Sequence, residues 1–232
     1  EYDDKGSLTK AVDPLGAVTT YRYDAAGQMI EHRDAEGGTS RFEYYPDGLL
    51  RSYTDPLGRT SSMTYDAYGC LATVTDPAGH TRSYRHDEAG KRVATTDALG
   101  AETKYEYDAA GRLIGLTDAK GNTTRFEYNS RGKLIAQIYP DGSKELYQYD
   151  ARGNLITKTN PDGTVLGYAY DLRDRLVRKT RPEGVIEYSY DSAGRLVAAK
   201  DALGETRFTY DPMGRILSSA YPGGKTVGYE YD

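Results

Sequence analysis

The stretch Tyr105–Gly121, YEYDAAGRLIGLTDAKG, decides the fold, because the rest of the chain repeats it with variations. It contains an aromatic pair, a Tyr-Asp step, a turn ending at Gly111, a run beginning at Leu113 and a second turn from Asp118. The same order of residues recurs along all 232 residues. A fixed period of this length is typical of a tandem-repeat architecture.

The Tyr-Asp step sets the period, with a spacing of 21 residues in nine intervals and 20 residues in two. We therefore predict a single array of about eleven repeats over residues 1–232. Because the chain starts and stops on this step, we expect it to be a segment of a longer polypeptide. The Asp of the step stands at Asp3, Asp24, Asp66, Asp87, Asp108, Asp150, Asp171, Asp191, Asp211 and Asp232, with Tyr45 and Asn129 in the same column.

Each repeat contains two predicted turns. The first follows the Tyr-Asp step, as in DAAG at 24–27, and the second lies ten residues later, as in DPLG at 13–16. Asp caps nearby amides in such turns, Pro presets its own φ, and Gly accepts a positive φ. We expect positive φ at the second-turn glycines, and Asp174, which replaces a first-turn Gly, to adopt a left-handed backbone. All nine prolines fall in these turns, so none interrupts a strand.

The runs between turns show the alternation of β-strands. Tyr21-Arg22-Tyr23 places two aromatic side chains on one face, and most of the other runs begin with an aliphatic residue such as Leu134. We predict an all-β antiparallel hairpin meander of about 22 strands without helices. At about 4.8 Å per strand, such a ribbon is roughly 100 Å wide and is expected to curl. The two 20-residue repeats should absorb their deletion beside the second turn, by loss of a bulge.

The predicted structural positions are the Tyr and Asp of the step, the two turn glycines, and the first aliphatic residue of a strand. They include Tyr23, Asp24, Gly27, Gly37, Tyr65, Asp66, Gly69, Gly79, Tyr107, Asp108, Gly111, Leu113, Asp118, Gly121, Tyr149, Asp150, Gly153, Gly163, Tyr190, Asp191, Gly194 and Gly204.

Composition narrows the possible functions. The formal net charge of −5 argues against a nucleic-acid partner, which favours clustered positive charge. No apolar run approaches the roughly 20 residues of a membrane span. The 23 Tyr residues replace aliphatic bulk at periodic sites, which favours an ordered and half-exposed β structure.

We expect no catalytic, cofactor-binding or metal-binding residue. The three histidines, His32, His80 and His86, occupy different columns of the repeat, and His86 stands in for a Tyr. The lone Cys70 occupies the column of Arg112, where we expect it to be exposed. Repeated Asp residues are a possible calcium signal and paired carboxylates a possible glycosidase signal, but turn capping explains the Asp columns better.

The unit YDxxGRLxxxxDxxGxxxxYxYD resembles the YD repeat of the Rhs family. That family includes bacterial polymorphic toxin shells, the C components of insecticidal toxin complexes, wall-associated contact-inhibition proteins and animal teneurins. The resemblance covers the whole chain. It implies a β-sheet that spirals into a hollow cocoon and encloses a C-terminal toxin domain, which an internal aspartyl protease releases.

The resemblance extends to the shell and not to the protease. The family's D-P-x-G-L-like step is matched only in part, by turns such as 13–16 and 55–58, which are followed by Ala17 and Arg59 in place of Leu. The implied partners are the remainder of the parent shell and the enclosed toxin, with possible self-association through edge strands. The implied localisation is delivery by bacteria, as a type VI secretion effector in interbacterial competition or as a toxin complex, after synthesis in the producing cell's cytoplasm.

The sequence therefore predicts a non-enzymatic encapsulating scaffold. An extracellular adhesion or carbohydrate-binding module remains the alternative, because rows of Tyr can also stack on sugars. Structural stacking is favoured, since the aromatic residues recur in every repeat and are not gathered in one patch.

Overall fold

The computed structural model describes residues 1–232 and consists of strands and turns. It contains no helix, and so none that could span a membrane. The prediction of 22 strands and no helix is therefore confirmed. The strands are β1 (Lys10–Val12), β2 (Val18–Tyr23), β3 (Met29–Arg33), β4 (Thr39–Tyr44), β5 (Leu50–Thr54), β6 (Thr60–Tyr65), β7 (Leu71–Thr75), β8 (Thr81–His86), β9 (Arg92–Thr96), β10 (Glu102–Tyr107), β11 (Leu113–Thr117), β12 (Thr123–Tyr128), β13 (Leu134–Ile138), β14 (Lys144–Tyr149), β15 (Leu155–Thr159), β16 (Val165–Tyr170), β17 (Leu176–Arg181), β18 (Gly184–Tyr190), β19 (Leu196–Asp201), β20 (Gly204–Tyr210), β21 (Ile216–Ala220) and β22 (Thr226–Gly228).

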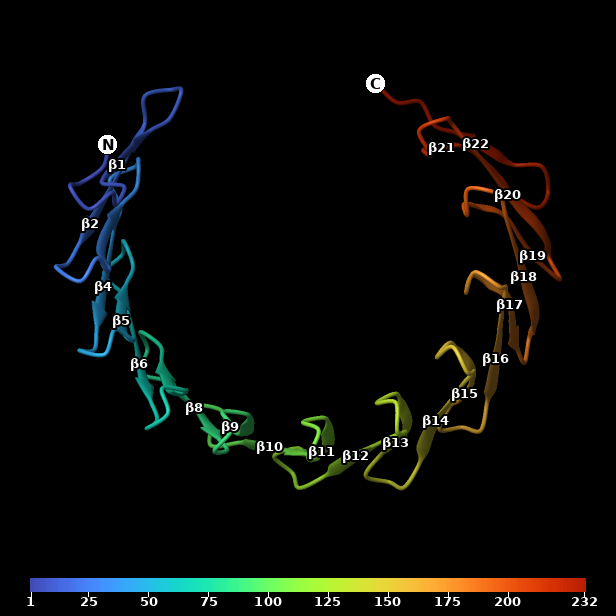
Figure 1. The fold of residues 1–232 in the computed structure, drawn as a ribbon, viewed down its shortest axis with the longest axis horizontal. Helices are drawn as coiled ribbons and strands as arrows, with labels where there is room; N and C mark the ends of the chain where they lie inside the picture. The colour runs from blue at the N-terminus through green and yellow to red at the C-terminus, as the bar shows by residue number, and fades with distance from the viewer. The chain divides into compact units, whose positions relative to one another are not determined.

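The chain forms two compact units. The first comprises residues 1–106 and 116–122, and the second comprises residues 107–115 and 123–232. In the first unit, β1 to β10 pair antiparallel in chain order. In the second unit, β12 to β22 do the same. Figure 1 shows these successive hairpins following the colour from blue to red.

The two turns of a repeat have the same backbone geometry. In the turn after β2, the Gly27 amide bonds the Asp24 carbonyl at 3.1 Å, and the Asp24 amide bonds the Gln28 carbonyl at 2.9 Å. In the turn after β3, the Gly37 amide bonds the Asp34 carbonyl at 3.1 Å. The glycine of each turn has a positive φ, for example 84° at Gly27 and 89° at Gly37.

The predicted positive φ at the second-turn glycines is confirmed at all eleven positions. They are Gly16, Gly37, Gly58, Gly79, Gly100, Gly121, Gly142, Gly163, Gly184, Gly204 and Gly224. Asp174 also adopts the predicted left-handed conformation, with a φ of 60°. Asp tolerates this region better than most residues because its short side chain can bond locally.

The two 20-residue repeats shorten the second turn, as predicted. Arg181 pairs directly with Gly184, and Asp201 pairs directly with Gly204, so each loop holds only two residues. In the longer repeats three residues separate the paired ends, as between Asp34 and Gly38. The missing residue is therefore removed from the turn, and the faces of the following strand are preserved.

The hairpins around the first turn contain a regular bulge. Arg22 pairs with Glu31, whereas Tyr23 pairs with Met29, so Ile30 has no partner in β2. Equivalent register shifts recur at the same point of later repeats. A bulge increases the local twist of its strand and redirects the neighbouring side chain.

The sheet buries few side chains completely. The buried apolar residues are the small Ala94, Ala136 and Ala198, and no large side chain is fully buried. Most Tyr and Leu side chains are half-buried. Stability therefore comes from contacts between neighbouring strands, each contributing roughly 0.2–1 kcal/mol, and not from a thick core.

Candidate functional site

The Tyr of the Tyr-Asp step makes a hydrogen bond to the preceding strand. The Tyr44 hydroxyl, at the end of β4, donates to the Met29 carbonyl of β3 at 2.8 Å. The same bond joins Tyr65 to Leu50 at 3.0 Å. It recurs for Tyr23, Tyr128, Tyr149, Tyr170, Tyr190, Tyr210 and Tyr231. The phenol thus satisfies a backbone carbonyl of the neighbouring strand.

The Asp of the step caps the first turn. The Oδ1 atom of Asp150 accepts hydrogen bonds from the Arg152 and Asn154 amides, both at 2.9 Å. Asn129, which replaces Asp in its repeat, accepts the same pair of amides through its own Oδ1 at 3.0 Å. The predicted turn-capping role of these columns is confirmed.

Two second turns that lack Asp at the first position use another cap. Tyr139 and Asn160 occupy that position in two second turns, and there the third residue takes over. Asp141 accepts the Ser143 amide at 2.9 Å, and Asp162 accepts the Thr164 amide at 2.8 Å. A carboxylate two residues before the amide can cap it in an Asx turn, and this signal was readable from the sequence.

An arginine four residues after the Asp joins two repeats. Arg195 donates its Nε to Asp191 at 2.7 Å and its Nη1 to the Asp211 carbonyl at 3.2 Å. Its guanidinium lies 4.8 Å from the ring centre of Tyr210. The contacts with the Asp and with the next Tyr ring recur around Arg112, Arg175 and Arg215. We call each such set of Asp, Arg and the next repeat's Tyr a clip.

The clips lower the pKa values of their carboxyl groups. Hydrogen bonds from the Arg195 amide and side chain hold the pKa of Asp191 below its ordinary value. The Arg215 side chain does the same for the pKa of Asp211. Elsewhere, burial and a hydrogen bond from its hydroxyl to Glu145 raise the pKa of Tyr147 well above its ordinary value. The contacts that lower the pKa values of Asp191 and Asp211 recur along the chain. The contact that raises the pKa of Tyr147 lies on an open face of the sheet.

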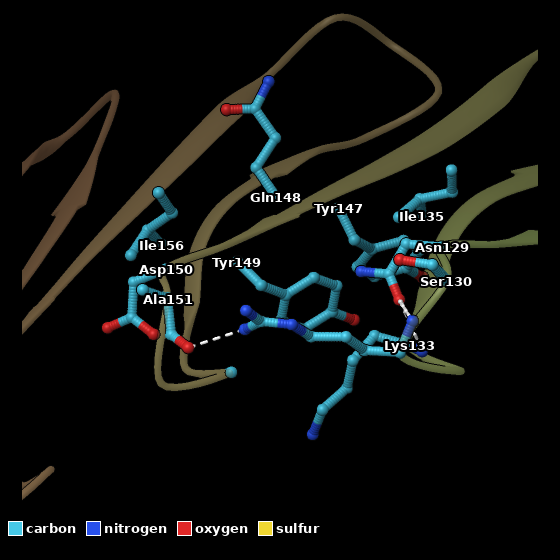
Figure 2. Close-up of a pocket in the computed structure, with 12 residues that line it drawn as sticks. Asn129, Ser130, Lys133, Ile135, Tyr147, Gln148, Tyr149, Asp150, Ala151 and Ile156 are labelled. Atoms are coloured by element: carbon cyan, nitrogen blue, oxygen red, sulfur yellow. Dashed lines mark hydrogen bonds between the residues drawn. The ribbon is translucent and has the colours of Figure 1, made fainter.

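The hollows of the surface also follow the repeat. One of about 570 Å³ lies between the first turns of two repeats and is lined by Lys133, Tyr147 and Tyr149. Figure 2 shows the Tyr149 ring between these turns, with Gln148 pointing away from the two tyrosines. A hollow of about 500 Å³ lined by Tyr21 and Tyr23 occupies the equivalent place in the first unit. This recurrence indicates a shape inherent in the repeat, and not a single binding pocket.

The histidines and the cysteine fall in different surroundings. The His32 ring stacks on Tyr21 with centroids 5.2 Å apart, and His80 lies 3.0 Å from Asp76. His86 takes the place of the Tyr in the aromatic row, as predicted, and Cys70 is half-buried, where we expected exposure. The positions of Asp66, Cys70 and His86 in the repeat did not indicate that these residues lie close together. In the structure, their ligand atoms all lie within 4.8 Å of one another.

The family comparison identifies the repeat. The model of the RHS Repeat family matches residues 2–39, 44–81, 71–103, 86–123, 107–144, 149–186 and 190–226. These matches leave only short gaps in the chain. A search of the curated proteins found no match.

Solved structures share the fold. The chain is similar to a chain in the crystal structure of TcdB2-TccC3-TEV, with a TM-score of 0.71 and 18% identity, covering 93% of this chain and 13% of that one. It is also similar to a chain of the Photorhabdus luminescens Tc holotoxin pore, with a TM-score of 0.51 and 16% identity over 94% of this chain and 15% of that one. The chain thus spans only about a seventh of these larger proteins.

Proposed function

The chain belongs to the RHS repeat family, and from this premise we propose that it is a segment of a shell that encloses a toxin. The eleven repeats form one array in the longer wall, and the wall acts by exclusion. It keeps the toxin away from the producing cell and from proteases until release. This role is structural, with no catalysis in the segment.

The observation that carries the proposal is the set of side-chain contacts that join successive repeats. The Tyr-to-carbonyl bonds recur along the chain and the clips occur at four repeats, and both add to the ladder of the sheet. Both kinds of contact occupy fixed positions of the repeat, and most of their side chains are half-buried at the turns. A continuous wall needs such lateral bonds because a sheet with little buried apolar volume has few other sources of stability.

The partners follow from the same premise. The segment meets the remainder of its shell at its edge strands, and the enclosed C-terminal toxin domain lies within. The neighbouring structures named above are toxin complexes, which supports delivery by bacteria within such a complex. A type VI effector in interbacterial competition is the other route that the family suggests, in each case after synthesis in the cytoplasm.

The test is limited proteolysis of the full-length parent protein, read with an antibody to its C-terminal domain. Tyr147 and Tyr149 are replaced together by Ala, which removes two half-buried aromatic side chains from one face and the bond to Leu134. We expect faster cleavage of the enclosed domain, with the intrinsic activity of the toxin unchanged. Gln148→Ala is the matched control, because Gln148 is exposed and points away from these rings (Figure 2).

Two results would contradict encapsulation. One is a variant whose β14 amide hydrogens exchange rapidly, which shows that the wall is breached, while its C-terminal domain stays fully protected from proteolysis. The other is specific sugar binding that the double variant abolishes and Gln148→Ala preserves. The second result would favour an adhesion or carbohydrate-binding module, for which the half-exposed Tyr rows supply the stacking surface.

A further inference from the structure

At one boundary between repeats, both the Arg and the Tyr of the clip are replaced by other residues. Cys70 stands where Arg112, Arg175, Arg195 and Arg215 stand in their repeats, and His86 stands where the next Tyr stands. The Asp column is unchanged there, as Asp66. The other repeat boundaries keep Tyr in the position of His86. The clip of Asp, Arg and Tyr thus becomes a set of Asp, Cys and His, all in the first unit.

The three donor atoms converge. The Cys70 sulfur, a ring nitrogen of His86 and a carboxylate oxygen of Asp66 all lie within 4.8 Å of one another. The Nδ1 atom of His86 is 3.4 Å from the Oδ2 atom of Asp66. In a tetrahedral zinc site with bonds of about 2.0–2.3 Å, ligand atoms are about 3.3–3.8 Å apart, so small side-chain rotations would complete the geometry.

His86 is a second, independent sign of a ligand. Its side chain is only 8% exposed, and its Nδ1 atom is buried without a hydrogen-bond partner. A buried polar atom without a partner is unfavourable unless something else satisfies it. Because this nitrogen faces the Asp66 carboxylate beside Cys70, a bound cation would satisfy all three groups together.

The turn holds Asp66 in a suitable orientation. Its Oδ1 atom accepts the Tyr68 and Cys70 amides at 3.0 and 2.9 Å, which fixes the carboxylate and leaves Oδ2 directed at His86. Gly90 borders the thiol, and a Cβ placed there would lie 3.4 Å from the Cys70 sulfur. The glycine therefore leaves space beside the thiol for a fourth ligand such as water.

We propose that Asp66, Cys70 and His86 bind one Zn²⁺ ion. Sulfur, imidazole nitrogen and carboxylate oxygen are the three donor types that zinc accepts in proteins, and a hard cation such as Ca²⁺ or Mg²⁺ would not select the thiolate. The ion would join the first turn of one repeat to the end of β8 in the next. It would replace the clip at this boundary by a metal cross-link whose binding free energy adds to folding.

The experiment measures metal binding by the purified, reduced 232-residue chain. Zn²⁺ is titrated in competition with a chromophoric chelator, and Co²⁺ is used as a spectroscopic probe. We expect one equivalent of Zn²⁺ per chain, a sulfur-to-cobalt charge-transfer absorption, and a rise in the thermal unfolding midpoint with Zn²⁺. Zinc should also slow the reaction of Cys70 with a thiol reagent.

The control variant restores the clip that four other repeats contain. Cys70→Arg combined with His86→Tyr rebuilds a clip with Asp66, so it should fold, as checked by circular dichroism, and should lose zinc binding and the cobalt absorption. His80→Gln alters the other His–Asp pair, at Asp76, and should retain both. Zinc binding that persists in the double variant, that disappears in His80→Gln, or that gives no sulfur-to-cobalt absorption in the unaltered chain would overturn the proposal.

Discussion

The hydroxyl of Tyr128 donates a hydrogen bond of 2.8 Å to the carbonyl of Leu113, fifteen residues earlier in the chain. Leu113 is the first residue of β11, and Tyr128 is the last residue of β12. The Arg112 guanidinium lies over the same ring, 5.0 Å from its centre. The Tyr of the Tyr-Asp step is therefore a connector between repeats, which uses its ring and its hydroxyl for two different contacts.

The hydroxyl bond can be tested in one strand. Tyr168 and Tyr170 both belong to β16, but only the Tyr170 hydroxyl bonds a carbonyl, that of Leu155 at 3.0 Å. We expect Tyr170→Phe to lower the free energy of unfolding by about 0.5–1.5 kcal/mol, because it leaves that carbonyl without its donor. Tyr168→Phe is the control and should change it by much less. Equal effects of the two variants in urea titrations would show that the hydroxyl hydrogen bond is not the contribution of this Tyr column to stability.

The turn glycine should be more sensitive than the turn aspartate. Gly121 has a φ of 86°, where a β-branched side chain is strained by roughly 1–2 kcal/mol. Asp118 accepts the Lys120 and Asn122 amides through Oδ1, and an Asn retains that acceptor, as Asn129 does. We expect Gly121→Val to destabilise the chain clearly more than Asp118→Asn. The reverse order in thermal unfolding would contradict this account of the turn.

Acid should weaken the clips. Arg195 holds the pKa of Asp191 below its unfolded value of about 3.9, so the folded state favours the ionised carboxylate. The resulting stability is present above the unfolded pKa and is lost as the pH falls through the lower folded pKa. Below about pH 4 the unfolded state binds more protons, and stability therefore falls with falling pH.

The measurement is the urea midpoint between pH 7 and pH 2. Asp191→Asn should make the decline below pH 4 shallower, because this position no longer takes up a proton on unfolding. Glu106→Gln, at an exposed residue outside the clips, is the comparison and should preserve the slope of the unaltered chain. A slope that Asp191→Asn leaves unchanged would count against a contribution from its clip.

The outer strands should mediate self-association of the isolated segment. The Tyr229 amide bonds Leu217, and successive amides of a strand alternate, so the Thr226 amide faces away from β21. Thr226→Pro removes this outward donor at the first residue of β22, where Pro is tolerated. We expect concentration-dependent oligomers of the unaltered chain and dimers at most for the variant, measured by sedimentation velocity. A monomer at all concentrations for the unaltered chain would refute the prediction.

The sequence predicted the strands well because the repeat supplies its own internal comparison. Eleven copies showed which positions vary and which do not, and the turn residues carried their conformations with them. Gly184 and Gly204 illustrate this, since the deletion in their repeats was correctly expected to be absorbed beside the second turn. Those features depend on residues close together in the chain, and local backbone preferences determine them.

Contacts between repeats were harder to predict from the sequence than the strands and turns. The alternation of aromatic residues indicated a shared face, but not that Tyr170 would bond Leu155 or that Arg195 would lie over Tyr210. Those contacts depend on the bulge and on the register of two neighbouring strands. The sequence showed the substitutions at Cys70 and His86 separately. Only the structure showed that both residues lie in the position of one clip.

The sequence by itself therefore determined the period, the strands, the turns and the family resemblance, because each rests on short-range conformational preferences repeated along the chain. The tertiary structure decided which columns touch across repeats. Strand pairing brings residues 14 to 20 positions apart into contact, as in the pairs Tyr190 with Leu176 and Asp66 with His86. Sequence spacing does not fix such contacts, since side-chain direction at a bulge and the lateral packing of one hairpin on the next select the partners.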